Sequence, residues 1–173
     1  MSRNRVFGVT GWKNSGKTLL VVRLVEELTR RGYRISTVKH AHHHFDIDKE
    51  GTDSYRHRQA GAGEVALVSG RRWALMHELR EEKEPPLEAI LERLAPCDLV
   101  IIEGYKRESH PKIEARRLES RNRAPLSEED PAIVAIAADH PISDETLPVF
   151  DLDDIPAIAD FVEKVSGLKE KNA

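Results

Sequence analysis

Near the start of the chain, the spacing of apolar residues changes from that of a short strand to that of a helix. Val6–Thr10 is a short apolar run, and leucines at every fourth position from Leu20 to Leu28 mark one face of a helix over residues 17–31. Gly32 is suited to end this helix, and residues 33–40 alternate like a strand. This order predicts a strand, a helix and a strand, as in a right-handed parallel βαβ unit.

The same alternation continues to the end of the chain. Apolar runs predict strands at residues 64–70, 72–79, 98–104, 132–139 and 148–152, and helical patterns occupy residues 54–63, 85–95 and 154–167. The polar segment 120–131 is expected to be a surface loop rather than a domain boundary. We therefore predict an α/β fold of the P-loop NTPase type, with a mostly parallel β-sheet and helices on both faces. It would form a single nucleotide-binding domain over residues 1–168, with a frayed tail at 169–173.

Composition narrows the function classes. The 173 residues include 27 basic and 30 acidic side chains, giving a net charge of −3, which does not favour a nucleic-acid or membrane binder. The single cysteine, Cys97, cannot form an internal disulfide. The N-terminus lacks the apolar core of a signal peptide, and the chain has no run of about 18 apolar residues. We expect a cytoplasmic protein.

The segment "GWKNSGKT", residues 11–18, matches the phosphate-binding P-loop pattern G-x-x-x-x-G-K-[ST]. Its glycines allow successive backbone N–H groups to converge on phosphate oxygens, and the following helix directs its positive dipole end to the same place. Lys17 adds a full positive charge, and the Thr18 hydroxyl is suited to ligate Mg²⁺. A strand before the loop and an amphipathic helix after it provide the expected context, so we predict nucleotide binding.

A magnesium site beside the P-loop also needs a carboxylate at the end of a neighbouring strand. Asp98 and Glu103 flank the apolar run "LVII" and lie at opposite ends of that predicted strand. Ligands of parallel sheets lie beyond the carboxyl ends of the strands, which selects Glu103. Asp98 is expected to be a solvated strand start.

A histidine- and aspartate-rich segment follows the second predicted strand. Adjacent histidines of an extended chain point in opposite directions, and carboxylate oxygens suit Mg²⁺ better than Zn²⁺. A transition-metal site is therefore the weaker interpretation, and a loop that senses the nucleotide or contacts an anionic partner is the stronger one. The residues concerned are His40, His42, His43, His44, Asp46, Asp48 and Asp53.

Three segments together resemble a known family. "GWKNSGKT", "TVKHAHHHFDIDKEGTDSYRHRQAGA" and "LVIIEGYK" occur in the order found in the molybdopterin-guanine dinucleotide biosynthesis adaptor proteins, MobB, and the resemblance covers nearly the whole chain. It implies a GTP-binding P-loop protein, usually dimeric. It also implies a partner, the guanylyltransferase MobA, which joins GMP to molybdopterin. At most slow GTP hydrolysis is expected, because no residue declares itself as the group that positions water, although His40 or an aspartate of the loop is a weak candidate.

The resemblance also implies site residues. The GTP phosphates would be held by Gly11, Asn14, Ser15, Gly16, Lys17 and Thr18, and Mg²⁺ by Thr18, Glu103 and Asp53. The family's signature loop, facing a substrate or partner, would include Lys39, His40, His42, Asp46 and Asp48. Leu19 departs from the second threonine that is common after the P-loop, but Thr18 keeps the metal-ligand role.

Selectivity for guanine is not decided by a motif, because the guanine-reading pattern N-K-x-D is absent. Asp139, at the end of a predicted strand, is either a guanine reader or a capping aspartate before "HP".

An ATP-dependent kinase or ligase-like enzyme on the same fold is the alternative function, with Arg71 and Arg72 as lid residues unless they form a simple hairpin turn. A basic cluster after Glu103 would hold a pterin phosphate or an acidic partner, or form a solvated charged strand, which is the commoner outcome. It comprises Lys106, Arg107, Lys112, Arg116 and Arg117.

Overall fold

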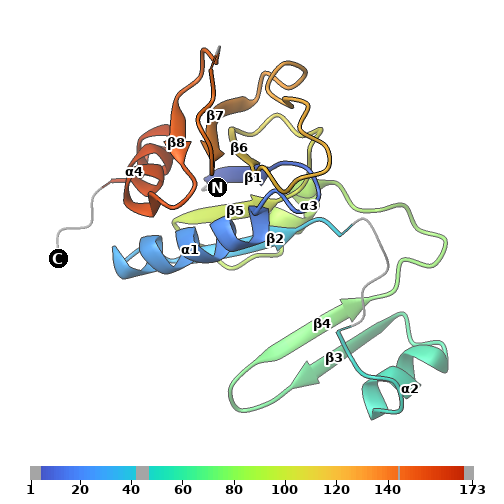
Figure 1. The fold of residues 1–173 in the computed structure, drawn as a ribbon. Helices are drawn as coiled ribbons and strands as arrows, with labels where there is room; N and C mark the ends of the chain where they lie inside the picture. The colour runs from blue at the N-terminus through green and yellow to red at the C-terminus, as the bar shows by residue number, and fades with distance from the viewer. Residues whose placement is uncertain (1–4, 42–46, 144, 170–173) are drawn as a thin grey trace. The chain divides into compact units, whose positions relative to one another are not determined.

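The structure, a computed structural model, describes residues 5–41, 47–143 and 145–169 (Figure 1). The chain divides into two compact units. One unit combines residues 1–40 with 94–173, and the other comprises residues 41–93. The prediction of one domain over residues 1–168 did not include this division.

A parallel six-stranded sheet forms the first unit. Its strand order is β2-β5-β1-β6-β7-β8, and every neighbouring pair is parallel. Because all strands run in the same direction, their carboxyl ends share one edge of the sheet. The strands are β1 (Val6–Thr10), β2 (Ile35–Lys39), β5 (Leu99–Glu103), β6 (Lys112–Arg116), β7 (Ile133–Ala138) and β8 (Val149–Asp151).

Two long helices, α1 (Lys17–Arg30) and α4 (Ile155–Ser166), pack against each other and against the sheet (Figure 1). Their buried side chains share one core with alternate residues of the central strands. The Asp154 side chain accepts a hydrogen bond from the Ala157 N–H at 3.2 Å and caps α4. This core contains Phe7, Val9, Leu20, Leu24, Leu28, Leu99, Ile101, Ile113, Ile158 and Val162.

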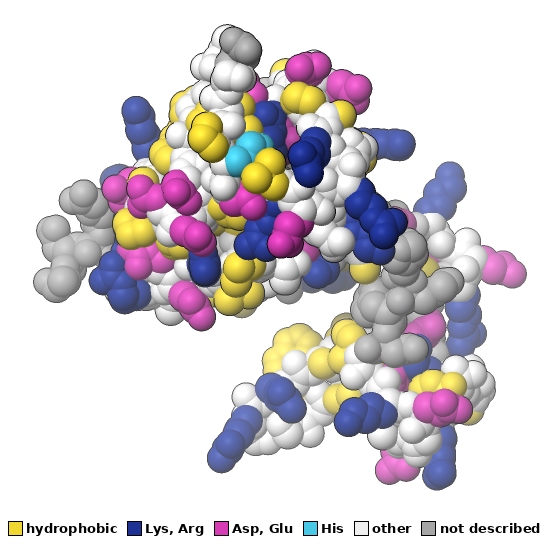
Figure 2. Space-filling model, viewed as in Figure 1, with side chains coloured by type: hydrophobic (Ala, Val, Ile, Leu, Met, Phe, Trp, Pro, Cys, Tyr) yellow, Lys and Arg dark blue, Asp and Glu magenta, His cyan; other side chains and the backbone are white. Residues whose placement is uncertain are grey.

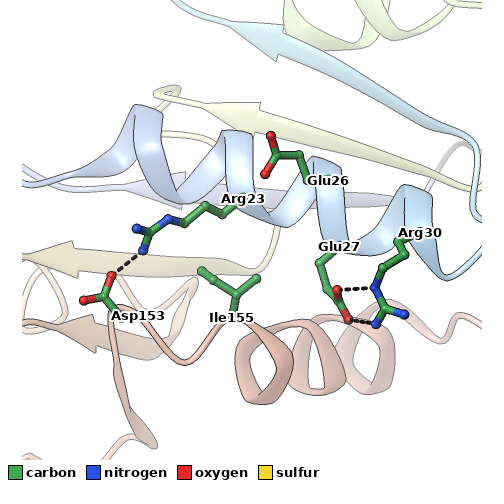
Figure 3. Close-up of a pocket in the computed structure, with 6 residues that line it drawn as sticks. All are labelled: Arg23, Glu26, Glu27, Arg30, Asp153 and Ile155. Carbon is green, nitrogen blue, oxygen red and sulfur yellow. Dashed lines mark hydrogen bonds and ion pairs between the residues drawn. The ribbon is translucent and has the colours of Figure 1, made fainter.

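Ion pairs line the groove between α1 and α4 (Figure 3). Arg23 pairs with Asp153, and Arg30 pairs with Glu27 on the same helix. Arg31, just after α1, bonds to Asp160 and Glu163 of α4 at 2.6 and 3.0 Å. Arg31 therefore joins the end of α1 to α4, and Arg23 joins α1 to the turn just before α4.

The prediction of a solvated charged strand at residues 112–116 is wrong. Lys112 is fully buried and Glu114 is 1% exposed, because β6 lies inside the sheet between β1 and β7. Ile113 and Ala115 face the helices, so the charged residues face the opposite side. There, segment 118–131 provides their partners. Lys112 Nζ lies 2.5 Å from Asp130 Oδ2, and the Glu114 carboxylate accepts N–H groups of Leu126 and Ser127 at 3.0 and 3.2 Å.

The second unit contains an antiparallel hairpin of β3 (Glu64–Val68) and β4 (Trp73–His77), with short helices α2 (Asp53–Gln59) and α3 (Leu87–Leu91). Arg58 of α2 bonds to Asp48 and Glu78, at 2.7 and 3.0 Å. One face of the hairpin buries Val65 and Met76. The other exposes apolar side chains, which gather over the hairpin in Figure 2; they are Val68, Trp73 and Leu75.

The predicted α/β fold with a mostly parallel sheet is confirmed. All strands and helices expected from the patterns are present, with shifts of a few residues at their ends. The strand β6 was expected only as a charged segment after Glu103. Its alternation of charged and apolar residues is typical of a half-exposed strand, and only the packing of segment 118–131 shows that both of its faces are covered.

Candidate functional site

The loop between β1 and α1 has the backbone conformation that the P-loop pattern predicts. Gly11 and Gly16 both have positive φ angles, 145° and 89°, which favour glycine. A Cβ on Gly11 would lie 2.6 Å from the Ala115 carbonyl oxygen, so the loop packs too closely for a larger residue. Asn14 also has a positive φ, 65°. The glycines therefore fix the close turn that leads into the N-terminus of α1.

Lys17 folds back over this turn. Its Nζ donates to the Trp12 carbonyl oxygen at 2.6 Å. Burial lowers the pKa of Lys17, and the nearby Lys106 and Lys39 lower it further, while Glu103 raises it. A cation that is partly desolvated and close to other cations is stabilised by a bound polyanion.

Glu103 and Thr18 meet at the carboxyl edge of the sheet. Thr18 Oγ1 donates to Glu103 Oε1 at 2.8 Å, and Lys39 Nζ lies 3.2 Å from the same oxygen. The Glu103 side chain is only 11% exposed. Asp98 lies at the other end of β5, where its carboxylate accepts the Arg34 N–H at 2.7 Å. Asp98 is therefore a partly buried cap rather than a solvated strand start.

The donor set fits a nucleotide with Mg²⁺. Ser15 Oγ is buried and lacks a hydrogen-bond partner within the described part of the chain, as does Thr10 Oγ1 at the end of β1. A buried hydroxyl without a partner is costly, and a phosphate or a bound ion would satisfy it. Thr18 and Glu103 offer the hard oxygen ligands that Mg²⁺ prefers. These residues therefore suit both groups.

Cationic side chains from several strand ends surround the P-loop. Lys39 ends β2, Lys106 follows β5, and Arg117 follows β6 with its Nε 2.8 Å from the position of a Cβ on Gly16. Lys106 Nζ also lies 4.2 Å from the centre of the Trp12 ring, a cation–π contact. Of the predicted basic cluster, Lys106 and Arg117 therefore lie at the site, whereas buried Lys112 and half-buried Arg116 form ion pairs within the fold.

The segment after Glu103 is held in a tight turn beside His40. Gly104 and Tyr105 have φ angles of 94° and 49°, and a Cβ on Gly104 would lie 3.2 Å from His40 Cβ. The His40 and Tyr105 rings lie 4.6 Å apart, and the His40 N–H donates to the Glu103 carbonyl oxygen. His40 thus lies beside the backbone at the end of β5, and its role in the signature loop stays a prediction.

The remaining predicted site residues are divided among three places. Asp139 follows β7, where its Oδ1 accepts the Leu118 N–H at 3.1 Å and lies 2.7 Å from His140 Nδ1. The His140 bond and the Leu118 bond contribute to lowering the pKa of Asp139, against the effect of its burial. Asp48 and Asp53 belong to the second unit. His42 and Asp46, with His43 and His44, lie outside the described residues.

Arg71 and Arg72 form a hairpin turn. Both of their N–H groups donate to Ser69 Oγ, at 3.4 and 3.2 Å, between β3 and β4. This is the simpler interpretation that the sequence offered for "GRRWALMHEL".

Sequence reasoning did not identify the role of Trp12. Its indole Nε1 donates to the Ala124 carbonyl oxygen at 2.7 Å, and Ser120 Oγ donates to the Lys13 carbonyl oxygen at 3.1 Å. Segment 118–131 is therefore fixed directly to the P-loop. The only signal in the sequence was a tryptophan within an otherwise polar loop, which does not reveal a partner 112 residues away.

Comparison with known proteins agrees with this geometry. Residues 6–139 match the family model described as MobB, molybdopterin guanine dinucleotide synthesis protein B. The chain belongs to this family. A molybdopterin-guanine dinucleotide biosynthesis adapter protein of Haemophilus influenzae is 41% identical over 91% of this chain and 87% of that protein. Its Escherichia coli counterpart is 37% identical over 93% of this chain and 91% of that protein.

Solved MobB structures share the fold. A crystal structure of Bacillus subtilis MobB superposes with a TM-score of 0.73 at 26% identity, covering 96% of this chain and 99% of the other. A MobB homologue from Bacillus stearothermophilus gives 0.67 at 29% identity, covering 95% and 99%. The resemblance found in the sequence is therefore confirmed.

Two features are absent from the described residues. No helix there has the length and apolarity needed to cross a membrane. Over residues 5–41, 47–143 and 145–169, no three histidine, cysteine or acidic side chains gather in a way that would hold a metal ion. The oxygen pair of Thr18 and Glu103 would therefore need ligands from a bound nucleotide or water to complete a magnesium site.

Proposed function

We propose that this MobB-family chain binds GTP with Mg²⁺ and acts as an adaptor for a MobA-like guanylyltransferase that attaches GMP to molybdopterin. The contact between Thr18 Oγ1 and Glu103 Oε1, 2.8 Å long at the P-loop, carries the nucleotide part of the proposal. The adaptor part rests on the names of the relatives that match the chain over most of its length.

Within this proposal, each residue group has a role. The turn of residues 11–16 and Lys17 would hold the phosphates, because the loop brings backbone N–H groups, a helix N-terminus and an ammonium together. Thr18 and Glu103 would hold Mg²⁺, which would neutralise phosphate charge when bound. Lys39 and Lys106 would offset the remaining negative charge. Hydrolysis would be slow, since the His40 ring is held against Tyr105.

A homodimer and a cytoplasmic location belong to the same proposal. The apolar side chains on the open face of the hairpin offer one surface that a second copy could cover; Val68 and Trp73 are 80% and 72% exposed there. Cys97 is a free thiol, which suits a reducing compartment. Size measurement by light scattering would test the dimer, and a monomer at micromolar concentration would contradict it.

The decisive experiment combines binding with reconstitution. Calorimetry of GTP and Mg²⁺ with the full chain should give binding that Lys17→Ala weakens by roughly 100-fold or more, because the mutation removes the central phosphate charge. Added to a MobA-type guanylyltransferase with molybdopterin and GTP, the chain should raise the yield of guanine dinucleotide, and Lys17→Ala should not.

A matched control is Lys164→Gln, which removes one positive charge from an exposed position of α4. It should bind and stimulate like the unmodified chain. Unchanged GTP affinity in Lys17→Ala would contradict the nucleotide site, and an unaffected yield with the unmodified chain would contradict the adaptor role.

A further inference from the structure

A second cavity adjoins the P-loop on the side away from Glu103. It lies between the P-loop, segment 117–123 and the turn after β7, and it is a partly open hollow with a volume of about 80 Å³. Six of the residues that line it carry the inference: Trp12, Ser15, Arg117, Asn122, Arg123 and His140. Ser15 belongs both to the cavity wall and to the P-loop, so the cavity borders the loop directly.

Strand order gives the nucleotide a direction. Glu103 ends β5, on one side of β1, whereas Arg117 follows β6 and His140 follows β7, on the other side. Thr18 and Glu103, the residues that would hold Mg²⁺ and offset phosphate charge, therefore lie on the β5 side of the P-loop. A nucleotide with its outer phosphates beside these two residues would extend across β1 toward β6. Its nucleoside end is thereby directed at the cavity.

Hydrogen-bond donors dominate the side chains that are open to this space. Asn122 Oδ1 accepts the Ala124 N–H at 3.0 Å, so its amide nitrogen is left as a donor. Arg123 donates from Nε to the Ser120 carbonyl oxygen and from one terminal nitrogen to the Leu118 carbonyl oxygen. Within the described residues, its other terminal nitrogen has no such bond. Glu114 also borders the cavity, but both of its oxygens already accept hydrogen bonds.

His140 adds an acceptor to this set of donors. Its Nδ1 lies 2.7 Å from Asp139 Oδ1, and an ionised carboxylate only accepts, so Nδ1 carries the proton. In the tautomer with its proton on Nδ1, the uncharged form of the ring leaves Nε2 as an acceptor. Asp139 itself does not line the cavity, and its Oδ1 already has two partners.

We propose that this cavity binds the guanine base of the nucleotide, with Asn122 and Arg123 as the selective donors and His140 as the acceptor. Guanine presents O6 and N7 as acceptors, whereas adenine replaces O6 with an amino donor. A donor-rich wall therefore favours guanine, and His140 Nε2 suits the N1–H or amino group of guanine. The inference rests on the proposed GTP binding and replaces the predicted role of Asp139 as the guanine reader.

The test is the ratio of GTP affinity to ATP affinity, measured by calorimetry with Mg²⁺ on the full chain. Asn122→Asp keeps the oxygen that accepts from Ala124 but exchanges a donor for a carboxylate, which repels O6 and accepts from the adenine amino group. We expect the ratio to fall by about tenfold or more, within the range for one mispaired base contact. Asn122→Ala, which adds no charge, should weaken GTP binding and leave ATP binding unchanged.

Two control variants separate a base contact at Asn122 from a general charge effect and from base recognition by Asp139. Lys164→Gln shifts the net charge by the same amount as Asn122→Asp but lies on exposed α4, so its ratio should equal that of the unmodified chain. Asp139→Asn keeps an oxygen for Leu118 and His140, so its ratio should change less than about threefold. A large fall in the ratio for Asp139→Asn would instead support Asp139 as the reader and overturn the inference.

The failure modes are distinguishable. Tight GTP binding with an unchanged ratio in both Asn122 variants would overturn the base site while leaving the proposed function intact. Equal affinities of the unmodified chain for GTP and ATP would overturn the proposed preference for guanine over adenine. Absence of binding for both nucleotides would overturn the base site together with the proposed function.

Discussion

Strands β5 and β6 flank β1 on its two sides, and both carry ionised side chains with little exposure. Glu103 of β5 contacts Thr18 and Lys39, and the Lys39 side chain is 61% exposed. Lys112 and Glu114 of β6 contact Asp130 and backbone N–H groups of segment 118–131. Both sets satisfy the rule that a buried charge needs partners. They differ in whether a bound cation can replace those partners.

The difference separates a proposed metal ligand, Glu103, from a structural group, Glu114. Glu103 lies at the carboxyl edge of the sheet, where its partners are a hydroxyl and an exposed ammonium that a cation can replace. Glu114 lies mid-strand and is bonded to the backbone of a loop that is itself fixed to the P-loop through Trp12. Low exposure and a charge are therefore insufficient to identify a site. The position of the charged residue along its strand and the chemistry of its partners decide whether it belongs to a binding site or to the structure.

The largest expected effect is a loss of stability when the buried ion pair of β6 is broken. Asp130→Asn removes the charge that pairs with fully buried Lys112, and loss of one partner of a buried pair typically costs about 3 kcal/mol. Urea denaturation followed by circular dichroism should show this loss in the free energy of unfolding. Glu129→Gln, the same change at an exposed neighbour, should stay within about 0.5 kcal/mol. Equal stability of both variants would contradict the structural role.

A change at Glu103 should instead lower nucleotide affinity and leave stability almost unchanged. Glu103→Gln keeps an oxygen for Thr18 but loses the charge for a divalent ion, so GTP affinity measured with Mg²⁺ should fall about tenfold or more. Affinity without Mg²⁺ should change little, and so should the free energy of unfolding. Asp98→Asn, at the other end of β5, serves as the matched control and should leave GTP affinity unchanged. A reversed pattern between these two variants would refute the assignment of Glu103.

The smallest expected effect is a pH dependence of the free energy of unfolding that arises from His110, just before β6. Both of its ring nitrogens are buried without partners in the described part of the chain, and burial lowers its pKa to about 4. The unfolded chain, with a histidine pKa near about 6.5, takes up the proton first as pH falls. The native state should therefore lose roughly 1 kcal/mol between about pH 7 and pH 5.

The check compares the unmodified chain with His110→Phe, a variant with a ring of similar size that does not titrate. Urea denaturation at about pH 7 and pH 5 should show a smaller loss for the variant than for the unmodified chain. The same loss in both would assign the pH dependence to other groups. Nucleotide affinity should be unaffected, because His110 lies at the amino end of β6, away from the P-loop.

Local patterns were sufficient where one segment contained the whole signal. The P-loop, the strand before it and the helix after it are contiguous, so "GWKNSGKT" predicted a glycine-dependent turn between β1 and α1. Glu103 also followed from the sequence, because parallel strands place their ends at one edge. The polar segment 120–131 was expected to be only a surface loop, and its contacts with β6 and Trp12 were not predicted.

The sequence by itself determined the α/β class, the glycine turn before α1, the carboxylate at the end of β5 and the family, since these depend on spacing along the chain and on the period of strands and helices. Tertiary structure alone decided that β6 lies next to β1, that Lys112 and Glu114 are covered, and that Asn122 lines a cavity beside the P-loop. Those features depend on which distant segments pack together. The same alternation of charged and apolar residues fits an exposed strand and a strand whose charges find partners in a distant loop.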